Sequence, residues 1–187
     1  MSKRLIAAIS VLTVLGLAGP AWSSSISLEL RAGYHVPASA AFRDVYKGGP
    51  AFAGQLEVRL TKTLSLWAGA EYFGKTGKLT FTGEETKIRI IPLTAGLKAQ
   101  LDSKSLCPYL AAGAGYFLYK EENIIGTADG SVFGFLGQAG LLFKATKFLY
   151  LDLYARYSAG RTKAAGPAIL AAELGGFQGG LGLIIGF

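Results

Sequence analysis

The sequence has few of the side chains on which most soluble enzymes and disulfide-stabilised domains depend. It contains one cysteine, Cys107, and one histidine, His35, among 187 residues. A single cysteine excludes an internal disulfide framework. Charged residues make up only 17% of the chain, and although the formal net charge is +7, the Lys and Arg residues form no stripe or motif typical of nucleic-acid binding. At 51% hydrophobic residues, the chain is too apolar to be disordered.

Long apolar runs are absent after the first residues. The chain starts with the basic stretch "MSKR", continues with the apolar run "LIAAISVLTVLGLA" and then reads "GPAWS", which contains small residues. This order is typical of a secretory signal peptide. The alternative is a membrane-anchor helix, which needs about 20 apolar residues and is therefore disfavoured. We predict a signal peptide over 1–23, cleaved after Ser23, and one mature domain over 24–187.

The mature chain instead alternates apolar and polar residues with a period of two. Eight segments do so, from "ISLELRAGYHV" to "LGGFQGGLGLIIGF". In the last segment Leu181, Leu183 and Ile185 share one face, while Gln178 and glycines occupy the other. A period of two predicts β-strands with one apolar face.

The connections between these segments alternate between long and short. They are predicted at 37–51, 61–63, 74–86, 102–106, 120–131, 145–147 and 159–172. This order is typical of a barrel with both chain ends on the side of the short turns. We predict an all-β fold, an eight-stranded antiparallel transmembrane β-barrel with short periplasmic turns and longer extracellular loops. A soluble sandwich or lipocalin-like barrel is the alternative, but its unbroken apolar face would have to fill a narrow interior.

Aromatic residues on the apolar face gather at two heights. Rings prefer the two interfaces of a membrane. The loop-side belt is predicted to contain Tyr34, Phe52, Tyr72, Tyr116, Phe133 and Tyr157, and the turn-side belt Phe143 and Phe187.

With the strands laid out, residues 26–187 resemble the small eight-stranded outer-membrane β-barrels of the OmpA/OmpX type. The resemblance rests on "IPLTAGLKAQL", "CPYLAAGAGYFLY" and the terminal aromatic residue. It implies the outer membrane of a Gram-negative bacterium and contacts with its lipid and lipopolysaccharide. It also implies that the assembly machinery reads Phe187 as a signal. A monomer without a following peptidoglycan-binding domain is expected.

The inward face carries charges of both signs in nearly equal number. Because an unpaired buried charge costs several kcal/mol, we predict a salt-bridged interior without an ion path. A narrow gated pore is the alternative. The predicted network consists of Glu29, Arg31, Glu57, Arg59, Glu71, Lys98, Lys144, Asp152 and Arg156.

A basic cluster is predicted at the outer rim, around Lys75, Lys78, Lys87 and Arg89. Lys87 and Arg89 share the lipid-facing parity with Ile91, which is tolerable near the interface if phosphates of lipopolysaccharide neutralise them. Ordinary solvated loop charge is the alternative.

The function that these observations favour is non-enzymatic, in envelope structure or surface interaction. The alternatives are a transporter or narrow pore for small apolar molecules, and a lipid-modifying enzyme. The last would use His35 with a serine such as Ser39, but no third group that could orient the histidine is identifiable. We expect no cofactor or metal, and assign no role to Cys107 or to the apolar loop 159–172.

Overall fold

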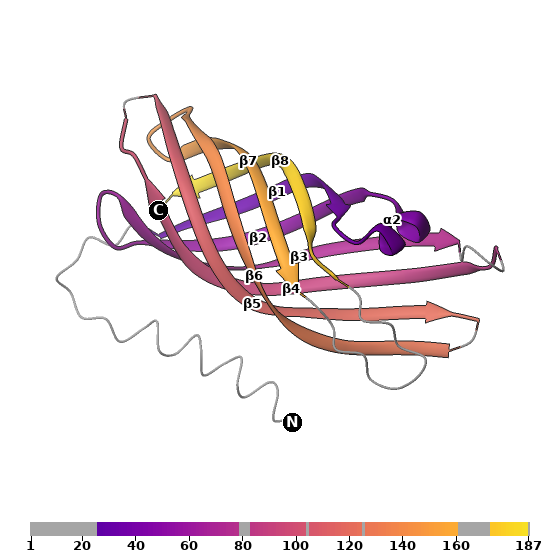
Figure 1. Cartoon of the computed structure of the whole chain (residues 1–187). Helices are drawn as coiled ribbons and strands as arrows, with labels where there is room; N and C mark the ends of the chain where they lie inside the picture. Colours follow the sequence, from indigo (N-terminus) through magenta and orange to yellow (C-terminus); the bar gives the residue numbers. More distant parts are fainter. Residues whose placement is uncertain (1–25, 79–82, 104, 125, 161–172, 187) are drawn as a thin grey trace, which may run out of the picture.

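The chain folds into a closed barrel of eight antiparallel strands (Figure 1). The computed structural model describes residues 26–78, 83–103, 105–124, 126–160 and 173–186; the predicted signal peptide, Phe187 and most of the loop 159–172 lie outside them. Each strand pairs with the next, and β8 closes onto β1. The strands are β1 (Ile26–Pro37), β2 (Gly49–Arg59), β3 (Leu64–Lys78), β4 (Glu85–Gln100), β5 (Leu106–Asn123), β6 (Gly126–Lys144), β7 (Leu149–Gly160) and β8 (Gly176–Gly186). The predicted fold class is confirmed.

The two faces of each strand are assigned as the alternation predicts. Leu56, Leu97 and Leu153 lie on the outside and are about half exposed, whereas Trp67 and Lys98 are buried inside. A large apolar outer surface is unsuited to water and suited to lipid. Within the described residues, no helix has the length and apolar character needed to cross a bilayer.

The barrel has two different ends. We call the end that carries the connections 60–63, 101–105 and 145–148, together with Ile26 and Gly186, the turn end, and the opposite end the loop end. Two of these turns share a Thr-Lys-X-Leu sequence. In each, the threonine Oγ1 accepts a hydrogen bond of 3.0 Å from the leucine N–H, at Thr61–Leu64 and Thr146–Leu149. The hydroxyl thereby fixes the same tight turn twice.

At the loop end, the central strands are longer than predicted. Most of the expected connections 74–86 and 120–131 is strand, since β3 runs to Lys78 and β6 begins at Gly126. In Figure 1 the ends of β3 to β6 extend beyond the neighbouring strands. These extensions carry charged residues on their outer face, such as Lys78, Lys87 and Lys120, so an apolar period of two does not extend over them.

The predicted loop 37–51 contains a short helix, α2 (Ala40–Tyr46). Ser39 caps it, its Oγ accepting from the Phe42 N–H at 3.4 Å. Phe42 and Tyr46 are buried at the loop end of the barrel. A helix of seven residues is too short to produce a clear period of 3.6, and the sequence pattern did not reveal it.

The outward aromatic residues lie at the predicted heights. Phe52 and Tyr72 are directly opposite each other, as are Tyr116 and Phe133, whose ring centroids are 5.5 Å apart. Tyr34, Tyr157 and, at the turn end, Phe143 are also exposed on the outside.

The contact of the buried Trp67 ring with Gly113 allows a test of which residues face inward. A methyl group added at Gly113 would lie 2.6 Å from the Trp67 ring and from the Ala95 carbonyl oxygen. We expect Gly113→Ala to lower the free energy of unfolding by about 1–3 kcal/mol because of this overlap. Gly137→Ala is the matched control, since nothing lies within 4 Å of its added methyl group. Urea unfolding of protein refolded in detergent micelles measures both. Equal losses would contradict the inward position of Trp67.

Candidate functional site

The barrel interior is the candidate site, and its first layer lies near the turn end. Lys98 Nζ is 2.7 Å from Glu57 Oε2, and both side chains are buried. The Lys98 ammonium also lies over the Tyr109 ring, 4.6 Å from its centroid. A cavity of about 180 Å³ lies on the turn-end side of this layer, and the ion pair forms part of its wall.

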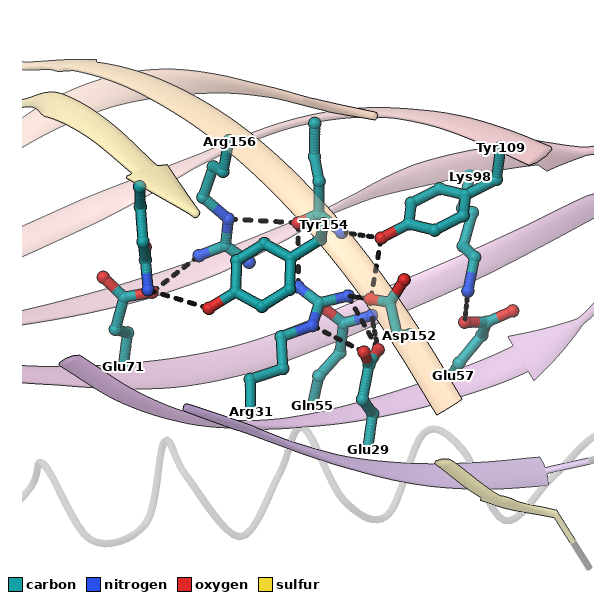
Figure 2. A network of polar contacts seen from close by, with 12 residues as sticks. Glu29, Arg31, Gln55, Glu57, Glu71, Lys98, Tyr109, Asp152, Tyr154 and Arg156 are labelled. Carbon is teal, nitrogen blue, oxygen red and sulfur yellow. Dashed lines mark hydrogen bonds and ion pairs between the residues drawn. The ribbon is translucent and has the colours of Figure 1, made fainter. Parts of the chain in front are cut away.

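The central layer is built around Arg31, as Figure 2 shows. Its guanidinium forms a bidentate pair with Glu29, at 2.6 and 2.7 Å, and donates to Gln138 Oε1 at 2.8 Å. The Tyr109 hydroxyl donates to Asp152 at 2.8 Å and accepts from Gln138 Nε2 at 2.5 Å. Only alternate residues of a strand point inward, so one strand supplies few of these side chains. The five come from four strands: two from β1 and one each from β5, β6 and β7.

The third layer lies toward the loop end. Arg156 Nη1 is 2.9 Å from Glu71 Oε2, and Arg156 Nε donates to Gln138 Oε1 at 3.1 Å. Gln138 therefore links this layer to the central one. Tyr154 fills the space between them, with the Arg31 guanidinium 5.0 Å from its ring centroid.

Between the charged layers and the loop end, the interior becomes apolar. A cluster of buried side chains closes the loop end of the barrel around the two buried residues of α2: Phe42, Tyr46, Ala51, Phe73, Ile88, Ile90, Phe117 and Leu174. The Tyr46 hydroxyl donates to Glu121 at 2.6 Å and contacts Thr86 Oγ1 at 2.9 Å. Burial and the hydrogen bond to Glu121 raise the pKa of Tyr46 well above its ordinary value. Tyr46 therefore stays neutral and holds α2 in place.

The polarity of β4 inverts where this apolar layer begins. Ile88 and Ile90 point inward and are buried, while Lys87 and Arg89 point outward and are exposed. From Ile91 toward the turn end the outer side chains are apolar, and from Thr94 on the inner face carries the polar residues Thr94, Lys98 and Gln100. This inversion is typical of a strand that leaves lipid and enters water, where an apolar interior and a polar exterior are stable.

The structure brings together seven of the nine predicted interior charges. Two predictions are corrected: Arg59 is half-buried beside the turn-end cavity, and Lys144 is exposed. Neither has an ion pair among the described residues. Arg59 and Lys144 are the last residues of β2 and β6, so they share the inward parity but lie at the rim, where water solvates them.

The basic cluster at the rim also differs from the prediction in part. Lys78, Lys87 and Arg89 are exposed on the outside, but Lys75 has the inward parity and lies against Gly49. Lys120, which the sequence analysis did not assign, stands opposite Arg89 on β5 and pairs with Glu122. Only the strand register reveals this neighbour.

His35 and Cys107 are packing residues in this structure. His35 is buried with its ring 5.0 Å from that of Phe73, and Ser39 is occupied in capping α2. Cys107 is buried near the turn end and donates to the Ser103 carbonyl at 3.4 Å. In the part of the chain that the structure describes, no group of His, Cys, Asp and Glu could hold a metal ion.

Comparison with solved structures places this architecture among known folds. The N-terminal β-barrel domain of OprF from Pseudomonas aeruginosa superposes with a TM-score of 0.56 at 16% identity, covering 87% of this chain and 97% of that one. The chain has the fold of the small outer-membrane β-barrels. Neisserial surface protein A gives a TM-score of 0.56 at 16% identity, covering 88% and 96%, and the outer membrane protein W of E. coli gives 0.52 at 16%, covering 89% and 100%. No protein-family model matches the sequence, and no curated protein matches it either.

The Glu57–Lys98 pair provides a test of the interior network. We expect Glu57→Gln to lower the free energy of unfolding by about 3–5 kcal/mol, because Lys98 would remain buried without its counter-ion. Arg59→Gln, two residues along β2, is the control and should change stability by no more than about 0.5 kcal/mol. Both values come from denaturant unfolding in the same micelles. A large loss of unfolding free energy for Arg59→Gln would mean that Arg59 is part of the interior network.

Proposed function

We propose that the chain is a non-enzymatic outer-membrane protein that acts in envelope structure or surface interaction and does not pass solutes through its interior. The observation that carries the proposal is the filled interior. Three charged layers cross the barrel, and an apolar layer with α2 lies above them.

The filled interior leaves little room for a permeating ion. The turn-end cavity of about 180 Å³ has the Lys98–Glu57 pair in its wall, and above it the central layer is held by hydrogen bonds from Arg31, Gln138 and Tyr109. Opening a path would separate buried ion pairs, which costs several kcal/mol for each. The apolar layer would then oppose an ion a second time, through the loss of its hydration.

The outer surface supports a place in the outer membrane. The apolar band ends at an aromatic belt, and the polarity inversion of β4 follows directly above it. The solved barrels that share the fold are an OprF domain, a neisserial surface protein and an outer membrane protein. The surface that remains for a specific function is the loop end, with its charged strand extensions.

Conductance in planar bilayers tests the filled interior. We expect the refolded protein to insert without producing steady single-channel currents, because opening a path would require the buried ion pairs of the three layers to separate. A general porin in the same bilayers is the positive control. Steady currents from the intact protein would favour the narrow pore, and efflux of small apolar molecules from loaded vesicles would favour the transporter.

The exposed basic residues at the loop end support a contact with the phosphates of lipopolysaccharide. Arg89 and Lys87 lie directly above the aromatic belt on the outer face. A basic residue near an anionic membrane surface contributes about 1 kcal/mol. We therefore expect Lys87→Gln with Arg89→Gln to weaken binding of lipopolysaccharide to the micelle-bound protein roughly 30-fold.

The matched control is Lys62→Gln with Lys144→Gln, which removes the same charge from exposed positions at the turn end. Binding is measured by titration at low and high salt. An equal effect of the two double variants would mean that net charge alone attracts the lipid and would exclude a site at the loop end.

A further inference from the structure

The buried charges of the interior do not balance. Among the described residues, four carboxyl side chains and three cationic side chains of the network are buried inside the barrel. Glu57 is paired with Lys98, and Glu71 with Arg156, each one to one. Glu29 and Asp152 therefore share a single cation, Arg31.

Arg31 is divided unequally between the two carboxyls. Its Nε and Nη2 donate to both oxygens of Glu29, at 2.6 and 2.7 Å. The Oδ2 of Asp152 lies 3.6 Å from Nη2, which is beyond hydrogen-bond distance, and accepts instead from the Tyr109 hydroxyl at 2.8 Å. The Oδ1 of Asp152 has no hydrogen-bond partner, although the side chain is completely buried. An ionised Asp152 would thus be a poorly compensated buried anion.

The two carboxyls also lie in the same layer of the interior. Nη2 of Arg31 is 2.7 Å from Glu29 Oε2 and 3.6 Å from Asp152 Oδ2. Both border Gly182 on β8, where an added methyl group would lie 2.6 Å from Glu29 Oε1 and 3.1 Å from Asp152 Cβ. Two neighbouring carboxylates that share one cation in a dry site do not both ionise readily, because each disfavours the charge of the other.

We propose that Glu29 and Asp152 form a proton-binding site that holds one shared proton at neutral pH. With this proton the buried charges of the network balance, three negative against three positive. The other groups that face the pair are Gln55, which donates weakly to Glu29 at 3.4 Å, and the Tyr109 hydroxyl. Lys98 and Arg156 lie in the adjacent layers and are committed to Glu57 and Glu71.

The proton links folding to pH with a definite sign. In the unfolded chain both carboxyls lose their protons near pH 4. At neutral pH, folding must therefore take up one proton from water, and stability falls as the pH rises, until the folded pair itself ionises. The ratio of folded to unfolded protein should fall by up to tenfold per pH unit in this window.

The first test compares Asp152→Asn with the wild type by urea unfolding in micelles between pH 5 and pH 9. An amide imitates the neutral carboxylic acid, so this variant should remain folded and should lose the decline in stability with pH. Glu71→Gln is the control, because Glu71 has a cation of its own, Arg156, which would remain buried without a counter-ion. This variant should lower the folded-to-unfolded ratio at least a hundredfold at every pH. A flat profile for the wild type, or equal damage by both variants, would overturn the proposal.

The second test needs no variant. Asp44, Asp102 and Asp129 are exposed, so Asp152 is the one buried aspartate among the chain's four. Carbon-13 NMR of selectively labelled aspartate carboxyls should show one signal, that of Asp152, whose titration is separated from the other three and lies at higher pH. Four ordinary titrations would overturn the proposal. So would a fourth signal that responds to sodium at constant ionic strength and not to pH, because a bound cation would then balance the pair.

Discussion

Closure of β8 onto β1 is the constraint on which the rest of the structure depends. It satisfies the backbone groups of both strands, so the sheet has no open edge, and it makes the interior of eight strands narrow. Each inward side chain must then find space as well as a polar partner. The inward face of β8 provides the space, since Gly180 and Gly182 lie against β1 where a larger residue would collide with the backbone or with Glu29. The glycines at the end of the sequence thus leave the space that the large charged residues opposite them occupy.

The interior joins two kinds of packing that stabilise in different ways. In the charged layers, Gln138 and Tyr109 connect ion pairs from several strands, and removing one member leaves another buried without compensation. In the apolar layer the contacts are not directional, and α2 covers them as a helix covers the core of a soluble protein. The barrel is therefore held by specific pairs in its middle and by apolar burial at its loop end.

The sequence predicted the parts that follow from a period of two, and it missed the parts that depend on height. Parity assigned Glu29, Lys98 and Asp152 correctly to the interior, because alternation reports the face of a strand directly. Parity could not show that Arg59 and Lys144 stand at strand ends, since depth in the barrel comes from register. It also could not show that Gln138 and Tyr109 link the charged pairs, because these contacts join strands far apart in sequence. The strand extensions do not follow from the sequence pattern, because their outer face is charged and an apolar period of two reports only the lipid-facing part of a strand.

The inversion of polarity along β4 sets the depth at which the barrel can sit in a bilayer. Only one residue separates the outward Arg89 from the outward Ile91, and a strand advances about 3.3 Å per residue. A shift of one such step toward the turn end would draw Arg89 into hydrocarbon, and a shift the other way would expose Ile91 to water. Both displacements raise the free energy, so the strand has a fixed vertical position without any partner to hold it. The outward residues of β4 alone therefore fix the depth of the barrel relative to the membrane surface.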